Sequence, residues 1–204
     1  MCIIIYIRII YTHQNRVDMN KTAISINYDE AKNVGFNLVE KDNIFGLFIL
    51  IGLETGLRSS DILNIKKTDF IKDDKKHFLK FTSQKTKKGA IRPISEYVYN
   101  KSIELTANND ILFHNDKYGC RYSDFWTGRN MKRHFPNYVI KAKANKKNVS
   151  AHSLRKSAGR KIYDKYGIEG ARDFLQHENY DTTKYYLQIE EQELNEKIVD
   201  ALSL

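Results

Sequence analysis

Apolar residues recur at helical spacing near the start of the chain and predict two consecutive helices. The segment 29–40 carries alanine, valine and leucine three or four positions apart, which is typical of an amphipathic helix. The segment 44–54 is apolar almost throughout and has the length of a helix that is buried on most sides. Gly56 follows it and supplies a helix stop.

A third helix is predicted directly after this stop. Ser59 or Ser60 is a suitable N-cap for a helix that runs through Ile62 to Ile65. Arg58 then stands at the junction where this helix begins. Backbone N–H groups and a guanidinium are therefore expected to face the same point.

Alternation of apolar and polar residues predicts a β-hairpin in the first half of the chain. The segment 77–81 alternates, a lysine-rich turn ends at Gly89, and a second short strand covers 90–94. Pro93 cannot donate a ladder hydrogen bond, so this second strand is predicted to be an edge strand. A further strand is predicted at 111–113.

Helical patterns return in the second half. Helices are predicted at 95–106, with Ser95 as its cap, and at 123–135, whereas the basic stretch 141–147 is predicted to be a solvated, mobile connection. The last third predicts four short helices, at 153–166, at 169–175, at 182–187 with Asp181 as cap, and at 191–202. The predicted fold class is therefore mainly α with a small antiparallel β-hairpin, an α+β arrangement.

The composition of the chain gives it a net positive charge. The chain has 204 residues, and a hydrophobic content of 41% supports an ordinary buried core. Lysine and arginine number 34 against 25 acidic residues, and the formal charge of +9 favours a polyanionic partner. A basic but unspecialised surface would give the same number, so the function has to be inferred from motifs.

The cysteines and the start of the chain exclude some classes. Cys2 and Cys120 form neither a CxxC pair nor a disulfide framework, which favours a reducing compartment and argues against a zinc site. The apolar opening 1–11 is interrupted by Arg8 and is too short to span a bilayer. It predicts either a β-strand or an upstream extension before a second start at Met19. We therefore expect no membrane association.

Two arginines are candidates for holding a phosphate. Guanidinium groups neutralise the charge on nonbridging oxygens and fix the phosphorus for in-line attack. Arg58 and Arg155 form the candidate pair. The alternative for Arg58 is a helix-start salt bridge with Asp61, which would also let Asp61 orient the guanidinium. The alternative for Arg155 is a solvated position on a basic helix.

A histidine and a basic loop add groups that move protons. His152 precedes Arg155 by three positions, so on a helix start the two side chains face the same side. Histidine has a pKa suited to proton transfer near neutrality, although a lone histidine is more often structural. The loop 84–89 presents several ammonium groups on a flexible tip. One of them can protonate a leaving oxygen, and the alternative is a loop that follows the phosphate backbone, which we assign to Lys87 and Lys88.

A tyrosine near the end of the chain is the candidate nucleophile. Tyr186 lies nine residues after His177 in a short, weakly apolar predicted helix, so its hydroxyl can reach a pocket rather than the core. The chain has 13 tyrosines, which makes any single one a weak candidate by itself. The adjacent Tyr185 would point about 100° away on a helix.

Four separated motifs together resemble those of the tyrosine recombinase, or phage integrase, family over roughly residues 28–190. TGLRSSDIL resembles the first arginine segment of the family, and QKTKKGAIRPI resembles its lysine hairpin. HSLR resembles the His-x-x-Arg motif, and QHENYDTTKYY resembles the segment with a histidine and the nucleophile nine residues on. The order of the motifs also matches, and the resemblance selects Tyr186 over Tyr185.

The resemblance implies a catalytic domain over 28–204 that ends with a helix at 191–202. In the family this helix commonly docks on a neighbouring protomer, and packing within its own chain is the alternative. The segment 1–27 is an extension without the helical DNA-gripping domain that family members usually carry. Three residues depart from the family pattern: Lys156 where a histidine often follows the second arginine, Gln176 in place of glycine, and Asp61 in place of the commoner glutamate.

The resemblance also implies a mechanism. Tyr186 attacks a scissile phosphate, forms a 3′-phosphotyrosine and releases a 5′-hydroxyl, with no metal ion or cofactor because the new linkage retains the bond energy. The implied roles are phosphate clamping by Arg58 and Arg155, general acid catalysis by Lys85, proton transfer by His152, a hydrogen bond to a nonbridging oxygen from His177, orientation of Arg58 by Asp61, and DNA contact by Lys87, Lys88 and Lys156.

The implied partner is double-stranded DNA, bound by a dimer to tetramer of this chain, with an accessory DNA-bending protein as a candidate helper. The implied location is the cytoplasm, on the nucleoid or host-cell DNA. Two alternatives stay open: a catalytically silent DNA-binding remnant or accessory protein of the same fold, and a type IB topoisomerase-like nicking and closing enzyme. An intact Tyr186 and paired arginines argue against the silent remnant. The topoisomerase-like enzyme would act as a monomer, so the state of assembly distinguishes it from a recombinase.

Overall fold

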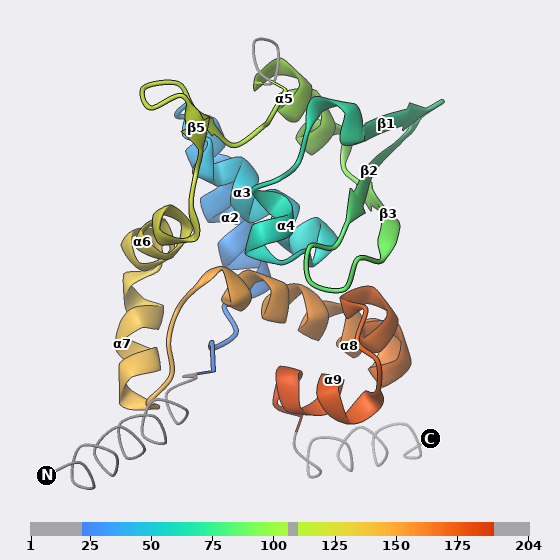
Figure 1. Ribbon diagram of the computed structural model, residues 1–204. Helices are drawn as coiled ribbons and strands as arrows, with labels where there is room; N and C mark the ends of the chain where they lie inside the picture. Colours follow the sequence, from blue (N-terminus) through green and yellow to red (C-terminus); the bar gives the residue numbers. More distant parts are fainter. Residues whose placement is uncertain (1–21, 106–109, 190–204) are drawn as a thin grey trace, which may run out of the picture.

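The computed structural model describes residues 22–105 and 110–189 (Figure 1). The prediction of a mainly α fold with a small antiparallel sheet is confirmed. The predicted helix at 191–202 and the apolar opening 1–11 lie outside the described residues. The elements are α2 (Tyr28–Val39), α3 (Phe45–Thr55), α4 (Ser59–Ile62), the 3-10 helix η1 (Lys67–Asp69), β1 (Phe70–Asp73), β2 (Lys76–Thr82), β3 (Gly89–Ile94), α5 (Glu96–Leu105), β4 (His114–Asn115), β5 (Cys120–Arg121), α6 (Asp124–His134), α7 (Pro136–Ala144), α8 (Ala151–Leu175) and α9 (Tyr180–Leu187).

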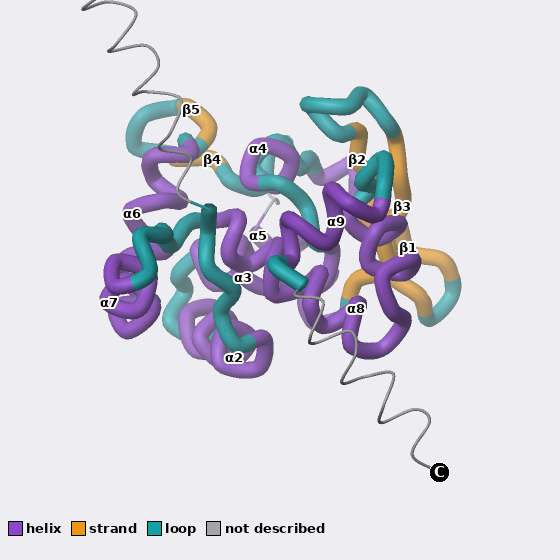
Figure 2. Tube along the Cα trace, turned by 90° about the horizontal axis from the view of Figure 1, so that it is seen from below, coloured by secondary structure: helices purple, strands orange, loops and turns teal. Residues whose placement is uncertain are grey.

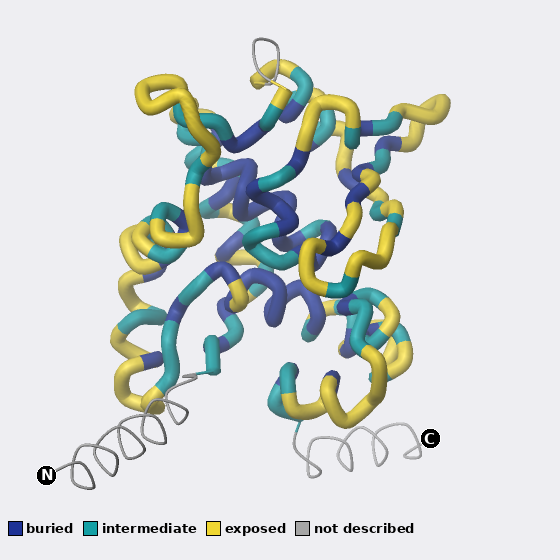
Figure 3. Tube along the Cα trace, in the orientation of Figure 1, coloured by how far each residue is buried: buried dark blue, intermediate teal, exposed yellow. Residues whose placement is uncertain are grey.

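Helix α3 is the centre of the core. Its residues from Phe45 to Leu53 are all buried, as the apolar run predicts, and Figure 3 shows this helix and the first half of α8 as the most buried segments. Helices α2 and α3 meet closely at Gly46, where a Cβ atom would lie 2.5 Å from the carbonyl oxygen of Gly35. Gly56 ends α3 in the left-handed conformation with φ 64°, which confirms the predicted stop.

The sheet has three antiparallel strands in the order β1, β2, β3, and it covers one side of the helical core (Figure 1). Strand β3 is an edge strand, as Pro93 predicts. Strand β1 was not predicted, because its four residues include two charged ones and are too few to show a period. It is stabilised instead by pairing with β2, in which Phe70 lies opposite Leu79.

The region around the predicted strand 111–113 differs from the prediction. Only a single bridge forms there, between Ile111 and Lys66, and the short hairpin of β4 and β5 follows. This backbone pairing explains why α4 ends at Ile62 instead of continuing to Ile65. The chain leaves the helix, and the carbonyl of Ile65 accepts a hydrogen bond from the N–H of Leu112, N···O 3.0 Å. The N-cap of α4 is Arg58 and not a serine.

The basic stretch 141–147 is mostly helical, which corrects the prediction of a mobile connection. Helix α7 begins at Pro136, a favoured first-turn residue, and runs to Ala144. The side chain of Ala142 is only 1% exposed, so burial of this face against the core stabilises a helix that its lysine content does not predict. Helix α6 was predicted correctly, and Ser123 caps it by accepting a hydrogen bond from the N–H of Trp126.

Helix α8 is the longest described helix and carries the HSLR motif at its start. The two helices predicted here are joined at Gly167, which has the non-helical angles φ 70° and ψ −168°. Helix α9 follows after a turn, and its cap is Asn179 instead of Asp181. Viewed from below, α9 lies beside α8 (Figure 2). No helix within the described ranges is long and apolar enough to cross a membrane.

A short N-terminal strap, residues 22–26, runs along the first turns of α8. Its backbone pairs with Asn148, and the N–H of Ile26 donates to Oγ of Ser157 at 2.9 Å. The same hydroxyl donates to the carbonyl oxygen of Ile26 at 2.5 Å. The strap therefore fixes the helix that carries His152 and Arg155.

Candidate functional site

Four separate segments bring the predicted site residues together at one place. Two adjoining hollows share Lys85, Ser150 and His152 in their linings. Arg58 lines the first, and Tyr186 lines the second, which has a volume of about 590 Å³. Arg155 and His177 lie next to Tyr186, as the contacts below show. All six residues that the motifs select are therefore neighbours in space.

Arg58 occupies the N-cap of α4 with an extended backbone, and its Nη1 donates to Oγ of Ser83 at 3.4 Å. The sequence predicts that Asp61 orients this guanidinium. In the described structure the hydrogen bond of Asp61 goes elsewhere: its Oδ1 accepts from the N–H of Gln84 at 2.8 Å. Asp61 is 4% exposed, and its Oδ2 has no hydrogen-bond partner among the described residues. Asp61 therefore holds the start of the lysine-bearing loop.

The β2–β3 loop has a defined path, which corrects the prediction of a flexible tip. The N–H of Lys87 donates to the carbonyl of Ser83 at 2.8 Å, and the N–H of Ser83 donates to the carbonyl of Lys88 at 2.9 Å. The N–H of Thr86 points to Oγ of Ser83 at 3.3 Å. These hydrogen bonds present Lys85, Lys87 and Lys88 as exposed side chains on a closed turn.

Arg155 is 4% exposed and is tied to the main chain. Its Nη1 donates to the carbonyl of Gly56 and its Nη2 to the carbonyl of Leu175. Burial lowers the pKa of Arg155 to about 10, so the side chain still carries its charge at neutral pH. Because guanidinium has five N–H donors, both carbonyls can be bound while other donors face Tyr186 and Arg58.

His152 stands in the first turn of α8, at the point shared by both hollows. One edge of its ring reaches solvent, yet crowding by surrounding protein atoms is the largest cause that lowers its pKa, followed by the positive charges of Arg155 and Arg58. Its imidazole is therefore neutral at pH 7 and can accept a proton.

Lys156, predicted to contact DNA, is only 3% exposed. Its Nζ donates to the carbonyl of Ala23 in the N-terminal strap at 3.2 Å, and the residue lines the hollow that contains Tyr186. Burial lowers the pKa of Lys156 to about 8, with Lys147 and Arg160 acting in the same direction. The structure thus places this ammonium in the wall of the site, and its contact with DNA stays a prediction.

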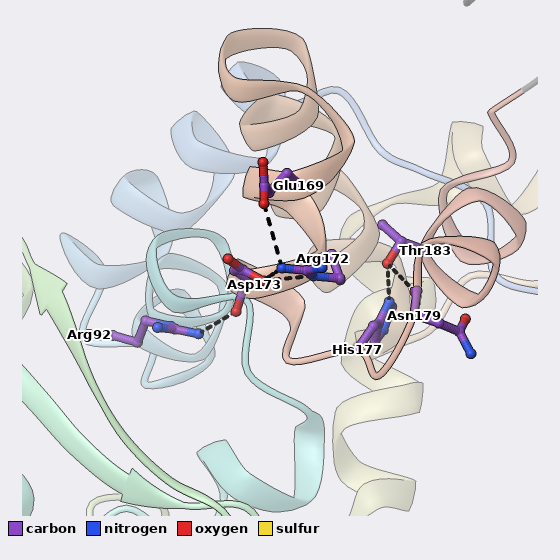
Figure 4. A network of polar contacts seen from close by, with 7 residues as sticks. All are labelled: Arg92, Glu169, Arg172, Asp173, His177, Asn179 and Thr183. Carbon is purple, nitrogen blue, oxygen red and sulfur yellow. Dashed lines mark hydrogen bonds and ion pairs between the residues drawn. The ribbon is translucent and has the colours of Figure 1, made fainter.

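His177 and Tyr186 lie together at the far side of the second hollow. Their rings meet edge to face with centroids 5.2 Å apart, and Nδ1 of His177 lies 3.0 Å from Oγ1 of Thr183 (Figure 4). Burial lowers the pKa of His177 to about 4, and Arg155, Arg58 and Lys85 add to this effect. The hydroxyl of Tyr186 donates to the carbonyl of His152 at 3.3 Å.

Tyr186 is more enclosed than its neighbour Tyr185, although both line the second hollow. Burial raises the pKa of its phenol, while the charges of Arg155 and Arg58 act in the opposite direction. Tyr185 is 77% exposed, as expected from its position about 100° further around the helix. Only the hydroxyl of Tyr186 therefore lies within reach of the two arginines.

Acidification is expected to destabilise this fold, with His177 contributing strongly. Its pKa is about 4 in the folded protein, against about 6.5 in an unfolded chain. Between these pH values the unfolded state binds the proton more readily than the folded state. The free energy of unfolding therefore decreases as the pH is lowered, by at most about 1.4 kcal/mol per pH unit for one group. The stabilisation that depends on neutral His177 is fully present above about pH 6.5. Urea unfolding at pH 7 and pH 5 measures this effect.

The variant His177→Gln is expected to reduce the loss of stability between pH 7 and pH 5. Equal pH dependence in the wild type and in His177→Gln would contradict the assignment.

Three residues that support the site were missed by sequence reasoning. Ser83 is fully buried and contacts both Arg58 and its own loop. Thr183 is fully buried and contacts His177. Arg92 reaches from β3 to the end of α8. Serine, threonine and arginine at such positions carry no local signal, because their partners are distant in sequence.

The arrangement suits a phosphate ester and a phenol nucleophile. The positive charges of Arg58 and Arg155 act on the phenol of Tyr186, and Lys85 and the neutral His152 line the same hollow as this tyrosine. Guanidinium groups bind phosphate oxygens through paired hydrogen bonds and stabilise charge that develops during attack. Within the described ranges, no group of three or more His, Cys, Asp and Glu side chains forms a metal-binding cluster.

Residues 37–193 match the sequence profile of the phage integrase family. A probable integrase/recombinase of Acholeplasma phage L2 is 30% identical over 145 residues, which cover 69% of this chain and 47% of that protein. The chain therefore spans about half the length of this curated relative.

Solved structures with the same fold are recombinases. The crystal structure of XerA recombinase matches with a TM-score of 0.67 at 20% identity, over 88% of this chain and 65% of that one. The XerH site-specific recombinase bound to a palindromic difH substrate, in its post-cleavage complex, matches with a TM-score of 0.66 at 21% identity, over 88% of this chain and 54% of that one.

Proposed function

Because this chain belongs to the phage integrase family, we propose that it is a site-specific DNA recombinase that cuts and rejoins strands through a covalent 3′-phosphotyrosine on Tyr186. The observation that carries the proposal is that Arg58, Lys85, Arg155 and His177 come from separate segments and lie around one tyrosine, Tyr186. A DNA-binding module has no need of a phenol on which the charges of two arginines act.

In the proposed reaction, the scissile phosphate lies between the two guanidinium groups. The oxygen of Tyr186 attacks the phosphorus, the phenol proton passes to the neutral imidazole of His152, and the bond to the 5′ oxygen breaks. Lys85, on its exposed turn, donates the proton that this oxygen takes up. Rejoining runs in reverse, with a 5′-hydroxyl attacking the phosphotyrosine and Tyr186 regaining its proton.

Arg155 and His177 support the phosphate from the protein side. Arg155 is fixed by the carbonyls of Gly56 and Leu175, so its remaining donors are held in place before the substrate binds. His177 is fixed through Thr183 and faces Tyr186. A bound phosphate raises the pKa of both histidines, because its negative charge offsets the surrounding cations.

The domain assignment and the partners belong to the same proposal. Residues 28–204 form the catalytic domain, with 1–27 as an extension, and double-stranded DNA is the substrate. We propose assembly of two to four copies on DNA through the segment 191–202, with an accessory DNA-bending protein as a helper, in the cytoplasm on nucleoid or host-cell DNA. The phage relative, a probable integrase/recombinase by name, supports this class of substrate.

The experiment that tests the function is detection of a covalent protein–DNA adduct. The protein is incubated with supercoiled plasmid and with a pool of nicked duplexes that trap cleaved ends, quenched in detergent and separated by denaturing electrophoresis. An adduct linked through a 3′ phosphate is the expected result. Salt-sensitive binding without adduct would favour the catalytically silent remnant. Plasmid relaxation without strand exchange would favour the type IB topoisomerase-like enzyme.

DNA affinity is expected to fall steeply with salt. Contacts between lysines and phosphates release counterions, so the logarithm of the binding constant falls linearly with the logarithm of salt concentration. Removing one phosphate contact by Lys87→Gln should lessen this slope by about 1, as measured by fluorescence anisotropy between roughly 50 and 200 mM salt. Lys101→Gln, a change on α5 at an ion pair with Glu104, is the matched control. A flat salt dependence of the wild type would contradict DNA binding.

A further inference from the structure

Arg92 lies on β3, within the segment that resembles the lysine hairpin of the family, but the proposed chemistry gives it no role. Its side chain links the sheet to the end of α8. Its Nη2 donates to the carbonyl of Phe174 at 2.8 Å. It also donates to the carbonyl of Asp173 at 3.3 Å, the contact that Figure 4 shows. Its guanidinium also lies over the ring of Phe174, 5.5 Å from the centroid. Arg92 therefore binds the last turn of a helix whose start carries His152 and Arg155.

The carbonyls that Arg92 binds belong to the turn that orients His177. The N–H of Gln176 donates to the carbonyl of Asp173 at 3.2 Å, and the N–H of His177 donates to the carbonyl of Arg172 at 3.0 Å. Gln176 has a positive φ of 53°, a conformation that favours glycine and that the surrounding contacts must stabilise. A cation at the C-terminal end of a helix also interacts favourably with the helix dipole.

Arg155 binds the next carbonyl along, that of Leu175. Two arginines from different elements thus hold three successive carbonyls at the end of α8. The ring of Phe174 lies against Gly56, where an added Cβ would be 2.4 Å from a ring carbon, and Gly56 is two residues before Arg58. The end of α8 is therefore the junction at which the sheet, the Arg58 turn and the His177 turn meet.

Burial separates Arg92 from the basic residues that face solvent. Its Nε is buried and has no hydrogen-bond partner among the described residues, and burial lowers the pKa of its guanidinium. The two described hydrogen bonds of the side chain both go to main-chain carbonyls, so the guanidinium acts inside the protein.

We propose that Arg92 is a positioning residue, which sets the distance between the hairpin that carries Lys85 and the turn that carries His177. Strand β3 leads directly out of the Lys85 loop, and Arg92 is the link from this strand to the His177 turn. Without the link, the edge strand and the turn can move apart while each keeps its own fold. The effect on cleavage rests on the proposed function, whereas the effect on the His177 turn does not.

The test compares two variants. Arg92→Met keeps an unbranched side chain over Phe174 but has no charge. Arg92→Lys keeps the charge and can still donate a hydrogen bond to one carbonyl. Lys80→Met removes a charge from an exposed position on the adjacent strand β2 and is the matched control. Two readouts are used. The first is the single-turnover rate of adduct formation at saturating DNA, together with the Kd for DNA. The second is amide hydrogen exchange of residues 176–177 in the protein alone.

Arg92→Met is expected to slow cleavage by roughly 10- to 100-fold, with Kd changed less than about twofold, because misplaced groups lower the rate and not the binding. Arg92→Lys should recover part of the rate, and Lys80→Met should cleave as the wild type does. Exchange at 176–177 should rise by roughly tenfold in Arg92→Met.

Three results would overturn the proposal: wild-type exchange at 176–177 in Arg92→Met, cleavage at the wild-type rate, or a loss that lies entirely in Kd and so marks Arg92 as a DNA contact. Failure of the proposed function is recognised separately, because the wild type would then form no adduct. In that case the exchange measurement alone decides whether Arg92 holds the turn.

Discussion

Replacing Tyr186 with Phe is expected to abolish the covalent protein–DNA adduct, reducing it below detection. The change removes one oxygen atom, which is the proposed nucleophile, and leaves the ring against His177. The hydroxyl donates a long hydrogen bond of 3.3 Å to the carbonyl of His152 and also has a hydrogen bond with the guanidinium of Arg155, so its loss should change stability by about 1–2 kcal/mol. Adduct yield on nicked duplexes and urea unfolding measure the two effects.

Tyr185→Phe is the matched control for this experiment, because it makes the same chemical change at the adjacent residue. Tyr185 is 77% exposed and lines the same hollow as Tyr186, so it tests whether position in the hollow alone is enough. This variant is expected to form adduct at a rate close to that of the wild type. If Tyr186→Phe kept its adduct while Tyr185→Phe lost it, the assignment of the nucleophile would be wrong.

Arg155→Met is expected to impair both stability and cleavage, whereas Arg58→Met is expected to impair cleavage alone. Arg155 binds the carbonyls of Gly56 and Leu175 in the interior, and its removal leaves both without this partner. Each hydrogen bond from a charged group contributes about 1.5–3 kcal/mol, so the free energy of unfolding should fall by roughly 3–5 kcal/mol. Arg58 has one described hydrogen bond, a weak one of 3.4 Å to Ser83.

Both arginine variants should slow adduct formation by roughly 100- to 1,000-fold, the range found when one group that stabilises transition-state charge is removed. Urea unfolding separates them, because only Arg155→Met should shift the midpoint strongly. Arg155→Lys should not restore stability, since an ammonium lacks the planar group that reaches two carbonyls at once. Equal stability of Arg155→Met and the wild type would show that the two carbonyl contacts contribute little.

The elements that local pattern determines were predicted well. The apolar run of α3 and the stop at Gly56 follow from the sequence, as does the edge position of Pro93 in β3. The elements that depend on tertiary contact were not predicted. Strand β1 is stabilised by pairing with β2, and α7 extends over the basic stretch because Ala142 packs into the core. Neither interaction is visible in a window of ten residues.

The candidate site shows the same division. The motif residues were selected through the resemblance of four ordered motifs to those of the family, and the structure brings these residues together. The residues that support them were assigned less well. Asp61 was predicted to orient Arg58, but its carboxylate accepts a hydrogen bond from the N–H of Gln84 in the loop. The contacts of Thr183 with His177 and of Arg92 with Phe174 had no sequence signal. Such roles depend on geometry between segments, which a single sequence does not encode locally.

The N-terminal strap has a consequence for how the chain folds during its synthesis. Residue Ile26 finds its partner in Ser157, 131 positions later, so the strap cannot seat until most of the chain has left the ribosome. At 5–20 residues per second, this delay is roughly 7–26 s. The apolar side chains of Ile24 and Ile26, both buried in the finished fold, are exposed to other nascent chains throughout that time. Closure of the strap over α8 is therefore expected to be a late step, and the helix that carries His152 and Arg155 gains its final support only then.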